Sequence, residues 1–282
     1  MSAAAPKIIR VTRTGFASVN TWVIEGKKGV VVIDAQRGLA MGREIVAAVQ
    51  ATEKPLLAVI ITHPHPDHFG GLAAILGAYP EVPVYASQTT TEVIRTDSNG
   101  YQAATLAAIP DDSPDAYPVP TVLFEDGEQL DFGSLKFVVD EIGSGEAESM
   151  TMLDMPQHNI LFVGDLVANG MTGFLLEQRS NNWIAQIDSV LASYGARNPH
   201  IYPGHGPDGE LTRLLAEQKH WLVSLQRLVM EKLGPAGISD DDVAAVSSAF
   251  SNLYPNFPEV AEIPNLLDLN IRSVAHELSM RS

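Results

Sequence analysis

Cysteine is absent from the 282-residue sequence, which excludes disulfides, thiolate metal ligands and a cysteine nucleophile. Basic residues are scarce: the sequence has 18 Lys and Arg but 34 Asp and Glu, which gives a formal charge of −16. A polyanion would be repelled over most of such a surface, so we expect no nucleic-acid partner. No segment approaches about 18 uninterrupted apolar residues, and the N-terminus lacks the apolar core of a secretory signal. We therefore expect no membrane association and a cytoplasmic location.

Short β-rich runs alternate with stretches in which apolar residues have helical spacing. The strand pattern alone suggests two antiparallel sets of strands with helices outside. Residues 87–120 are polar and rich in proline, with helical spacing only in part, and are interpreted as an insertion near the functional site. The expected strands are 7–12, 21–25, 30–34, 56–62, 82–86, 121–124, 129–132, 135–140, 150–155 and 160–163, and the expected helices include 211–232, 240–250 and 266–278.

Three histidines and an aspartate fall within six positions, His63-Pro64-His65-Pro66-Asp67-His68, directly after an apolar run. The two prolines stiffen this loop, because each fixes its own φ and biases the preceding residue toward an extended conformation. Polar side chains in such a loop gain nothing from burial unless a partner satisfies them, and a divalent cation would do so. His63 and His65, two apart on extended backbone, can converge on one ion. Asp67 and His68, displaced along the loop, can reach a second.

The pattern His-x-His-x-Asp-His after a strand resembles the signature of the metallo-β-lactamase superfamily. Three further positions match the family in the right order. Asp165 in Gly164-Asp165 matches the carboxylate that bridges two metals, and His205 in Pro203-Gly204-His205-Gly206 matches the last ligand. Asp34, at the end of an early strand, matches a structural Asp that supports the ligand loop. The resemblance spans residues 30–206.

One position departs from the usual family pattern. Where many members place a third His, this chain has Gly143-Ser144-Gly145-Glu146-Ala147-Glu148-Ser149, and counting back from the next strand puts Glu146 in the ligand position. Two His and one Glu form an established zinc-ligand set. A Glu in this position resembles the alkylsulfatase branch of the family. Glu148 is the alternative ligand if the alignment of this turn with the family pattern slips by two residues.

The resemblance implies an α/β fold, an αββα sandwich of two mixed β-sheets with outer helices, followed by a C-terminal helical extension. We expect a catalytic domain over 1–210, with 88–120 as its insertion or lid, and an extension over 211–282 packed on the same domain. His63, His65 and Glu146 are the expected ligands of one divalent metal and Asp67, His68 and His205 of the other, with Asp165 between them. We expect two zinc ions, with manganese or iron as alternatives because the added carboxylate favours harder ions.

The expected activity is metal-dependent hydrolysis. A water shared by two metal ions is acidified toward neutrality and attacks the substrate, with Asp67 as proton acceptor and Asp165 as the second catalytic carboxylate. A small carboxylic ester or lactone is the leading substrate class, because residues 88–120 and the C-terminal helices would form a fairly apolar lid. The alternatives are an alkyl or aryl sulfatase, a phosphodiesterase, β-lactam hydrolysis as a side activity, and a non-enzymatic metal-binding module. The partner is then a small molecule, and the long helical stretch from Leu211 is compatible with a homodimer. The expected substrate-contacting residues are Phe69, Tyr101, Asn169, Phe174 and Trp183.

Overall fold

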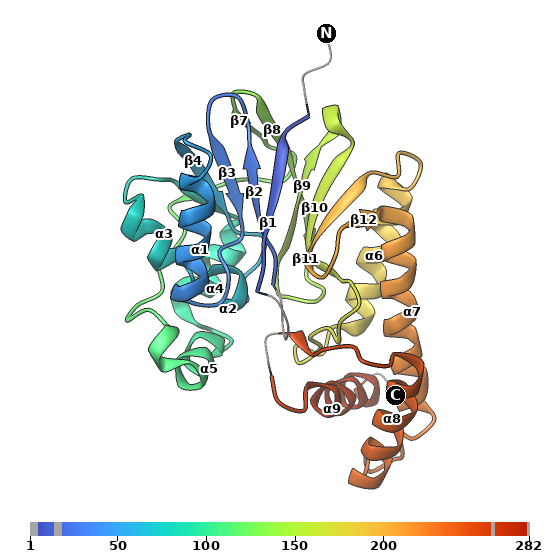
Figure 1. Ribbon diagram of the computed structural model, residues 1–282. Coiled ribbons are helices and arrows are strands. Elements are labelled where there is room, and N and C mark those ends of the chain that lie inside the picture. Colours follow the sequence, from blue (N-terminus) through green and yellow to red (C-terminus); the bar gives the residue numbers. More distant parts are fainter. Residues whose placement is uncertain (1–4, 14–18, 261–262, 281–282) are drawn as a thin grey trace.

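Two β-sheets lie face to face with helices on their outer sides, as the computed structural model shows (Figure 1). The structure describes residues 5–13, 19–260 and 263–280. The first sheet has the order β1-β2-β3-β4-β5-β6 and the second the order β12-β11-β10-β9-β8-β7. The strands of the first are β1 (Lys7–Val11), β2 (Thr21–Glu25), β3 (Val30–Ile33), β4 (Leu56–Ile60), β5 (Val84–Ala86) and β6 (Val122–Leu123). Those of the second are β7 (Gln129–Phe132), β8 (Leu135–Gly143), β9 (Met150–Met155), β10 (Ile160–Ala168), β11 (His200–His205) and β12 (Gly209–Glu210).

Both sheets are mixed, so the suggestion of two antiparallel sets of strands is wrong. Strands β3 to β6 run parallel, as do β10 and β11, whereas the other neighbouring strands pair antiparallel. The connections within the parallel sets pass through α1 (Leu39–Gln50), α2 (Pro66–Phe69), α3 (Leu72–Ala78), α4 (Gln88–Thr96), α5 (Tyr101–Ala108) and α6 (Ser180–Tyr194). Parallel neighbours need such crossovers, which strand periodicity alone does not reveal. The sandwich of two mixed sheets implied by the resemblance is confirmed.

The hydrophobic core has three main layers. Trp22, Ile60, Phe137 and Phe162 are among the buried residues between the two sheets. A second layer joins the outer side of the first sheet to α1, α3 and α4. A third joins β10 and α6 to α7 (Leu211–Met230), α8 (Asp240–Leu253) and α9 (Leu266–Ser279). The C-terminal helices therefore share a continuous core with the second sheet.

One edge of the sandwich collects the ends of the strands that carry the predicted site. Strands β3, β4, β10 and β11 all end at this edge, because parallel strands present their C-terminal ends together. In Figure 1 it is the lower edge, with α2 and α5 on one side and α9 beneath. Loops at the C-terminal ends of parallel strands can therefore converge from both sheets.

Candidate metal centre

The histidine loop follows β4 and turns directly into the short helix α2. His65 has extended backbone, with φ −83° and ψ 136°, and Pro66 occupies the first helical turn. The backbone N–H of His68 donates to the carbonyl of His65 at 2.9 Å, which closes the turn. His63, His65, Asp67 and His68 are all buried. The two prolines and the tight turn thus hold the four side chains inside the protein.

Asp165 and His205 come from the adjacent parallel strands β10 and β11. Gly164, with φ +50°, pairs with Pro203, so the residues that follow each of them lie close together. A Cβ on Gly204 would lie 1.9 Å from Oδ1 of Asp165, so this position accepts only glycine. The glycine in the Pro-Gly-His-Gly sequence is therefore required by the approach of the Asp165 carboxylate.

Glu146 arrives from the loop between β8 and β9. Its side chain is buried, and Oε1 lies 3.3 Å from Nδ1 of His65, while Oε2 lies 3.9 Å from Nε2 of His63. Glu148, two residues on, is exposed. The structure therefore brings Glu146, and not Glu148, to the histidine loop.

The donor atoms fall into two groups in which every atom lies within 4.8 Å of the others. Asp165 belongs to the first group, and its carboxylate also lies 3.2 Å from Nε2 of His68 and 3.2 Å from Nε2 of His205. It therefore lies between the two groups. The first group is His63, His65, Glu146 and Asp165, and the second is Asp67, His68 and His205.

Many of these polar atoms are buried without a hydrogen-bond partner among the described residues. They include Nε2 of His63, His68 and His205, both carboxylate oxygens of Glu146 and Oδ1 of Asp165. An unpaired buried polar atom costs the folded protein about 1–3 kcal/mol of stability, so six such atoms in one cluster call for a binding partner. Imidazole and carboxylate are the donors that zinc and similar ions bind, so the residues present fit divalent metal ions.

Each histidine of the loop has its second ring nitrogen fixed by a hydrogen bond. Asp34, in the left-handed region at φ +60°, accepts from Nδ1 of His68 at 2.8 Å and from the backbone N–H of Thr62 at 2.9 Å. The Thr62 hydroxyl donates to Asp34 and accepts from Nδ1 of His63 at 2.9 Å. These bonds leave the lone pair on Nε2 of both histidines facing the cluster, as a metal ligand needs.

His65 is fixed by a residue that the sequence did not indicate. Its Nε2 lies 3.0 Å from Oε1 of Glu177, which also forms an ion pair with Arg179. Glu177 follows β10 in a stretch without a recognisable motif, so no local signal marks it. The contact depends on the three-dimensional path of the chain between β10 and α6.

The electrostatics of the cluster favour protons where no cation is bound. Burial raises the pKa of Glu146 to about 7. Burial alone would lower the pKa of His205, but the carboxylates of Asp165 and Asp67 outweigh it and raise the pKa to about 9. Burial favours a neutral Asp67, yet His68 and His205 hold the pKa of that carboxyl well below its usual range. Cations binding to this cluster would therefore displace protons.

A cavity of about 320 Å³ opens onto the cluster at His65, Asp67, Glu146 and Asp165. Its walls are largely apolar and come from α5, from the segment after β10 and from the stretch before α9. Arg37 provides a positive charge beside them. The other lining residues are Pro66, Tyr101, Ala104, Thr105, Ala108, Phe174, Leu176, Val260, Ile263 and Pro264.

Two of the five expected substrate-contacting residues, Tyr101 and Phe174, line this cavity, and the other three do not. Phe69 is fully buried in the core of the first sheet, and its ring packs edge-on against Tyr117. Trp183 is fully buried behind the second sheet, where its indole N–H donates to the carbonyl of Leu166 at 3.0 Å. Both were expected as aromatic residues of the cavity wall, but the helices that carry them, α2 and α6, point both rings into the core.

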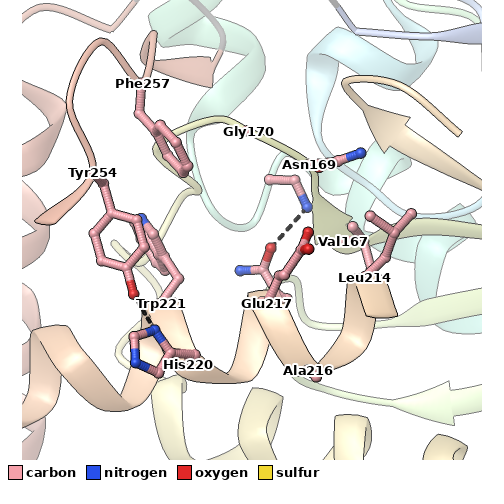
Figure 2. A pocket seen from close by; sticks show the side chains of 12 residues that line it. Val167, Asn169, Gly170, Leu214, Ala216, Glu217, His220, Trp221, Tyr254 and Phe257 are labelled. Atoms are coloured by element: carbon pink, nitrogen blue, oxygen red, sulfur yellow. Dashed lines mark hydrogen bonds between the residues drawn. The ribbon is translucent and has the colours of Figure 1, made fainter. Parts of the chain in front are cut away.

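Asn169 lies in a different hollow, of about 360 Å³, with Trp221, Tyr254 and Phe257 (Figure 2). Its backbone N–H donates to the carbonyl of His205 at 3.1 Å, and its side-chain amide donates to the carbonyl of Pro207 at 2.7 Å. Asn169 therefore holds the loop of His205 in place and is not among the residues that line the cavity at the cluster.

Comparison with known proteins identifies the family. Residues 14–233 match the family described as the metallo-beta-lactamase superfamily, and the chain belongs to this superfamily. It is 28% identical over 200 residues to metallo-beta-lactamase type 2 of Bacillus cereus, which covers 70% of each chain. It is 24% identical over 306 residues to the (R)-specific secondary-alkylsulfatase of a Pseudomonas species, covering 93% of this chain and 43% of that protein.

A solved structure also supports the fold. A metallo-beta-lactamase family protein from Thermus thermophilus aligns with a TM-score of 0.69 and 18% identity, over 99% of this chain and 94% of that one. The superfamily and the curated relatives are metal-dependent hydrolases, and this chain is an enzyme of that class. Among the described residues, no helix is both long and apolar enough to cross a membrane.

Proposed function

We propose that the enzyme holds two divalent metal ions and hydrolyses a small carboxylic ester or lactone. His63, His65 and Glu146 hold the first ion, Asp67, His68 and His205 hold the second, and Asp165 lies between them. The two groups of buried donors, with their unpartnered atoms, support this assignment. Zinc suits the imidazole-rich set, and manganese or iron are the alternatives because Glu146 adds a hard anionic donor.

Divalent ions held by these residues would supply Lewis-acid polarisation of a substrate carbonyl and would lower the pKa of water. Asp67 is the proposed proton acceptor, because its carboxylate borders the cavity where a substrate would lie. Asp165 is the second proposed catalytic carboxylate, since it contacts histidines of both groups. Both carboxylates face the space that a substrate would enter.

The apolar wall of the cavity is the observation that carries the ester or lactone proposal. Tyr101, Phe174 and Leu176 would bury an acyl or aryl group, and burial of apolar surface contributes about 25 cal/mol per Å². A volume of about 320 Å³ suits a small ligand. Residues 88–120 and the stretch before α9 both contribute to this wall, which supports their proposed role as a lid over the domain formed by 1–210.

A sulfate ester is the second candidate, supported by Glu146 and by Arg37 at the cavity. A guanidinium can bind a sulfate through two parallel hydrogen bonds. The similarity to a secondary-alkylsulfatase over 93% of this chain points the same way. The β-lactamase similarity supports β-lactam hydrolysis as a side activity.

A panel of chromogenic substrates distinguishes these candidates. Aryl ester, lactone, aryl sulfate, phosphodiester and cephalosporin would be offered to protein loaded with zinc or manganese, with chelator-treated protein and Asp67→Asn as controls. We expect kcat/KM to be highest for the ester or lactone and to fall by about 100-fold or more in Asp67→Asn. Preferential turnover of the sulfate would replace the ester with the second candidate, and no turnover of any substrate by loaded protein would overturn both.

A further inference from the structure

His65 is held differently from the other two histidines of its loop. His63 and His68 are fixed by Thr62 and Asp34, which belong to the first sheet and its loops, whereas His65 is fixed by Glu177 from the second half of the chain. A carboxylate only accepts hydrogen bonds, so Nε2–H of His65 donates to Glu177 at 3.0 Å. The lone pair of His65 is then on Nδ1, the atom that lies 3.3 Å from Glu146.

The contact between His65 and Glu177 is sheltered from solvent. The side chains are 6% and 8% exposed, and Arg179 pairs with the second carboxylate oxygen of Glu177. The ion pair restrains the Glu177 carboxylate, so the orientation of the His65 ring depends on where residues 173–181 place Glu177.

That segment is held in place by the C-terminal helix α9. The side chain of Asn270 accepts from the N–H of Leu175 at 2.9 Å and donates to the carbonyl of Gly173 at 2.8 Å. One turn later, the Ser273 hydroxyl donates to the carbonyl of Leu175 at 2.6 Å. Asn270 and Ser273 are buried, so these bonds are shielded from competition with water.

A further turn along α9, Glu277 holds the other end of the segment. Its carboxylate accepts from the backbone N–H of Ser180 at 2.8 Å and of Asn181 at 3.1 Å, the first residues of α6. A carboxylate at a helix N-terminus satisfies free N–H groups and interacts favourably with the helix dipole. Asn270, Ser273 and Glu277 are spaced three and four residues apart, so they share one face of α9.

We propose that Glu177 is a positioning residue that orients His65 toward the first metal ion, and that α9 sets the position of Glu177 through residues 173–181. This inference rests on the proposed metal ligands. It makes the C-terminal extension a working part of the metal centre, although α8 and α9 lie beyond the residues matched by the family model. Hydrogen-bonded partners of this kind typically contribute about 10–100-fold to metal affinity.

The test measures metal affinity at each site by titrating the chelator-treated enzyme with Co²⁺ and following its ligand-field absorption, with a competing chelator to obtain Kd. Glu177→Leu removes the acceptor, and we expect the affinity of the first site to fall by about 10–100-fold while the second site changes little. Glu177→Gln retains the shape of the side chain but replaces the carboxylate with an amide oxygen, which is a weaker acceptor. We therefore expect a smaller loss of affinity and a shift of the Co²⁺ ligand-field band. Asp154→Asn is the matched control, because Asp154 is also buried and paired with an arginine, Arg197, but contacts no residue of the cluster.

A second pair of variants tests the role of α9. Ser273→Ala removes the bond to Leu175, and Ser279→Ala removes a comparable bond to the carbonyl of His276 on the exposed end of the same helix. We expect Ser273→Ala to weaken the first site by up to about fivefold, the equivalent of one net hydrogen bond, and Ser279→Ala to leave it unchanged. Equal effects of the two substitutions on the metal affinity of the first site would overturn the proposal that α9 sets the position of Glu177.

The outcomes separate this inference from the proposed function. Two Co²⁺ ions bound by wild type with unchanged affinity in both Glu177 variants would overturn the inference and leave the proposed ligands standing. Equal losses at both sites would also overturn it, because a general structural defect would then explain the result. Failure of wild type to bind two ions would overturn the proposed function itself.

Discussion

Glu146→Gln should stabilise the metal-free enzyme and, separately, reduce the stabilisation that bound metal provides. The substitution keeps the size of a buried side chain but removes its negative charge and one anionic donor. In the metal-free protein, burial raises the pKa of Glu146 from 4.5 to about 7. The folded state therefore holds a proton on this carboxyl more tightly than the unfolded state does.

The magnitude for the metal-free protein follows from that shift. Each pKa unit corresponds to about 1.4 kcal/mol, so ionisation of buried Glu146 costs the fold about 3 kcal/mol above pH 7. Stability from this group is complete below the unfolded pKa and is lost as the pH rises through about 7. Glutamine does not titrate, so metal-free Glu146→Gln should be more stable than wild type at pH 8 by up to about 3 kcal/mol, with little difference at pH 4.

With metal bound, this advantage of the variant should be largely or wholly lost. Loss of a direct ligand should weaken affinity by at least the 100-fold seen for strong indirect partners, which lowers metal-dependent stabilisation by about 2.7 kcal/mol at a fixed excess of metal. Chemical denaturation with and without metal, together with metal content by mass spectrometry, measures both effects. Glu148→Gln is the control, because Glu148 is exposed two residues away. A Glu146 variant that keeps two metals and the full metal-dependent stabilisation would refute the assignment of Glu146 as a ligand.

Three further predictions address the pH dependence, the support and the cavity of the site. Metal affinity should rise with pH between about 6 and 9, because Glu146 and His205 must lose protons whose pKa values are raised to about 7 and about 9. Calorimetry in buffers of different ionisation enthalpy counts the protons released, and an affinity that does not change with pH would contradict the prediction. Asp34→Asn should weaken the second metal by about 10–100-fold, because His68 loses a charge-assisted hydrogen bond, and should weaken the first metal less, because Asp34 reaches His63 only through Thr62. Equal loss at both sites, measured by metal titration, would argue for a general folding defect instead. Phe174→Ala should raise KM for an apolar ester by about tenfold with little change in kcat, because about 1–2 kcal/mol of apolar contact is lost. Steady-state kinetics with short and long acyl chains measures this, and a lower kcat with unchanged KM would contradict it.

Much of the site could be predicted from the sequence because its geometry is local. The loop from His63 to His68 is short, fixed by two prolines and placed directly after a strand, so the spacing of its side chains follows from backbone rules. Asp165 and His205 also follow strands, next to glycines that the close packing requires. The register of one strand was enough to favour Glu146 over Glu148, and the structure buries the former and exposes the latter.

The rest depends on contacts between distant segments, which a local pattern cannot encode. The direction of β4, β5 and β6 is set by the helices that connect them, and strand periodicity is the same for parallel and antiparallel pairs. Phe69 is adjacent to the histidine motif, yet one helical step turns its ring toward Tyr117 in the core. Glu177 reaches His65 from a segment that is hydrogen-bonded to Asn270 of α9, about 95 residues further along the chain.

The balance of charge at the cluster suits the two cations proposed above. Five carboxylates gather around the histidines and are buried or nearly so, while Arg37 and Arg179 are the cationic side chains found at the cavity and at Glu177. Five negative and two positive charges leave an excess of three, which a single divalent ion would only reduce. Uncompensated charges in a protein interior cost several kcal/mol each, so the protein must take up protons or metal. Two divalent ions would turn the excess into a small positive charge, which suits a site that stabilises an anionic transition state. The five carboxylates are those of Asp34, Asp67, Glu146, Asp165 and Glu177.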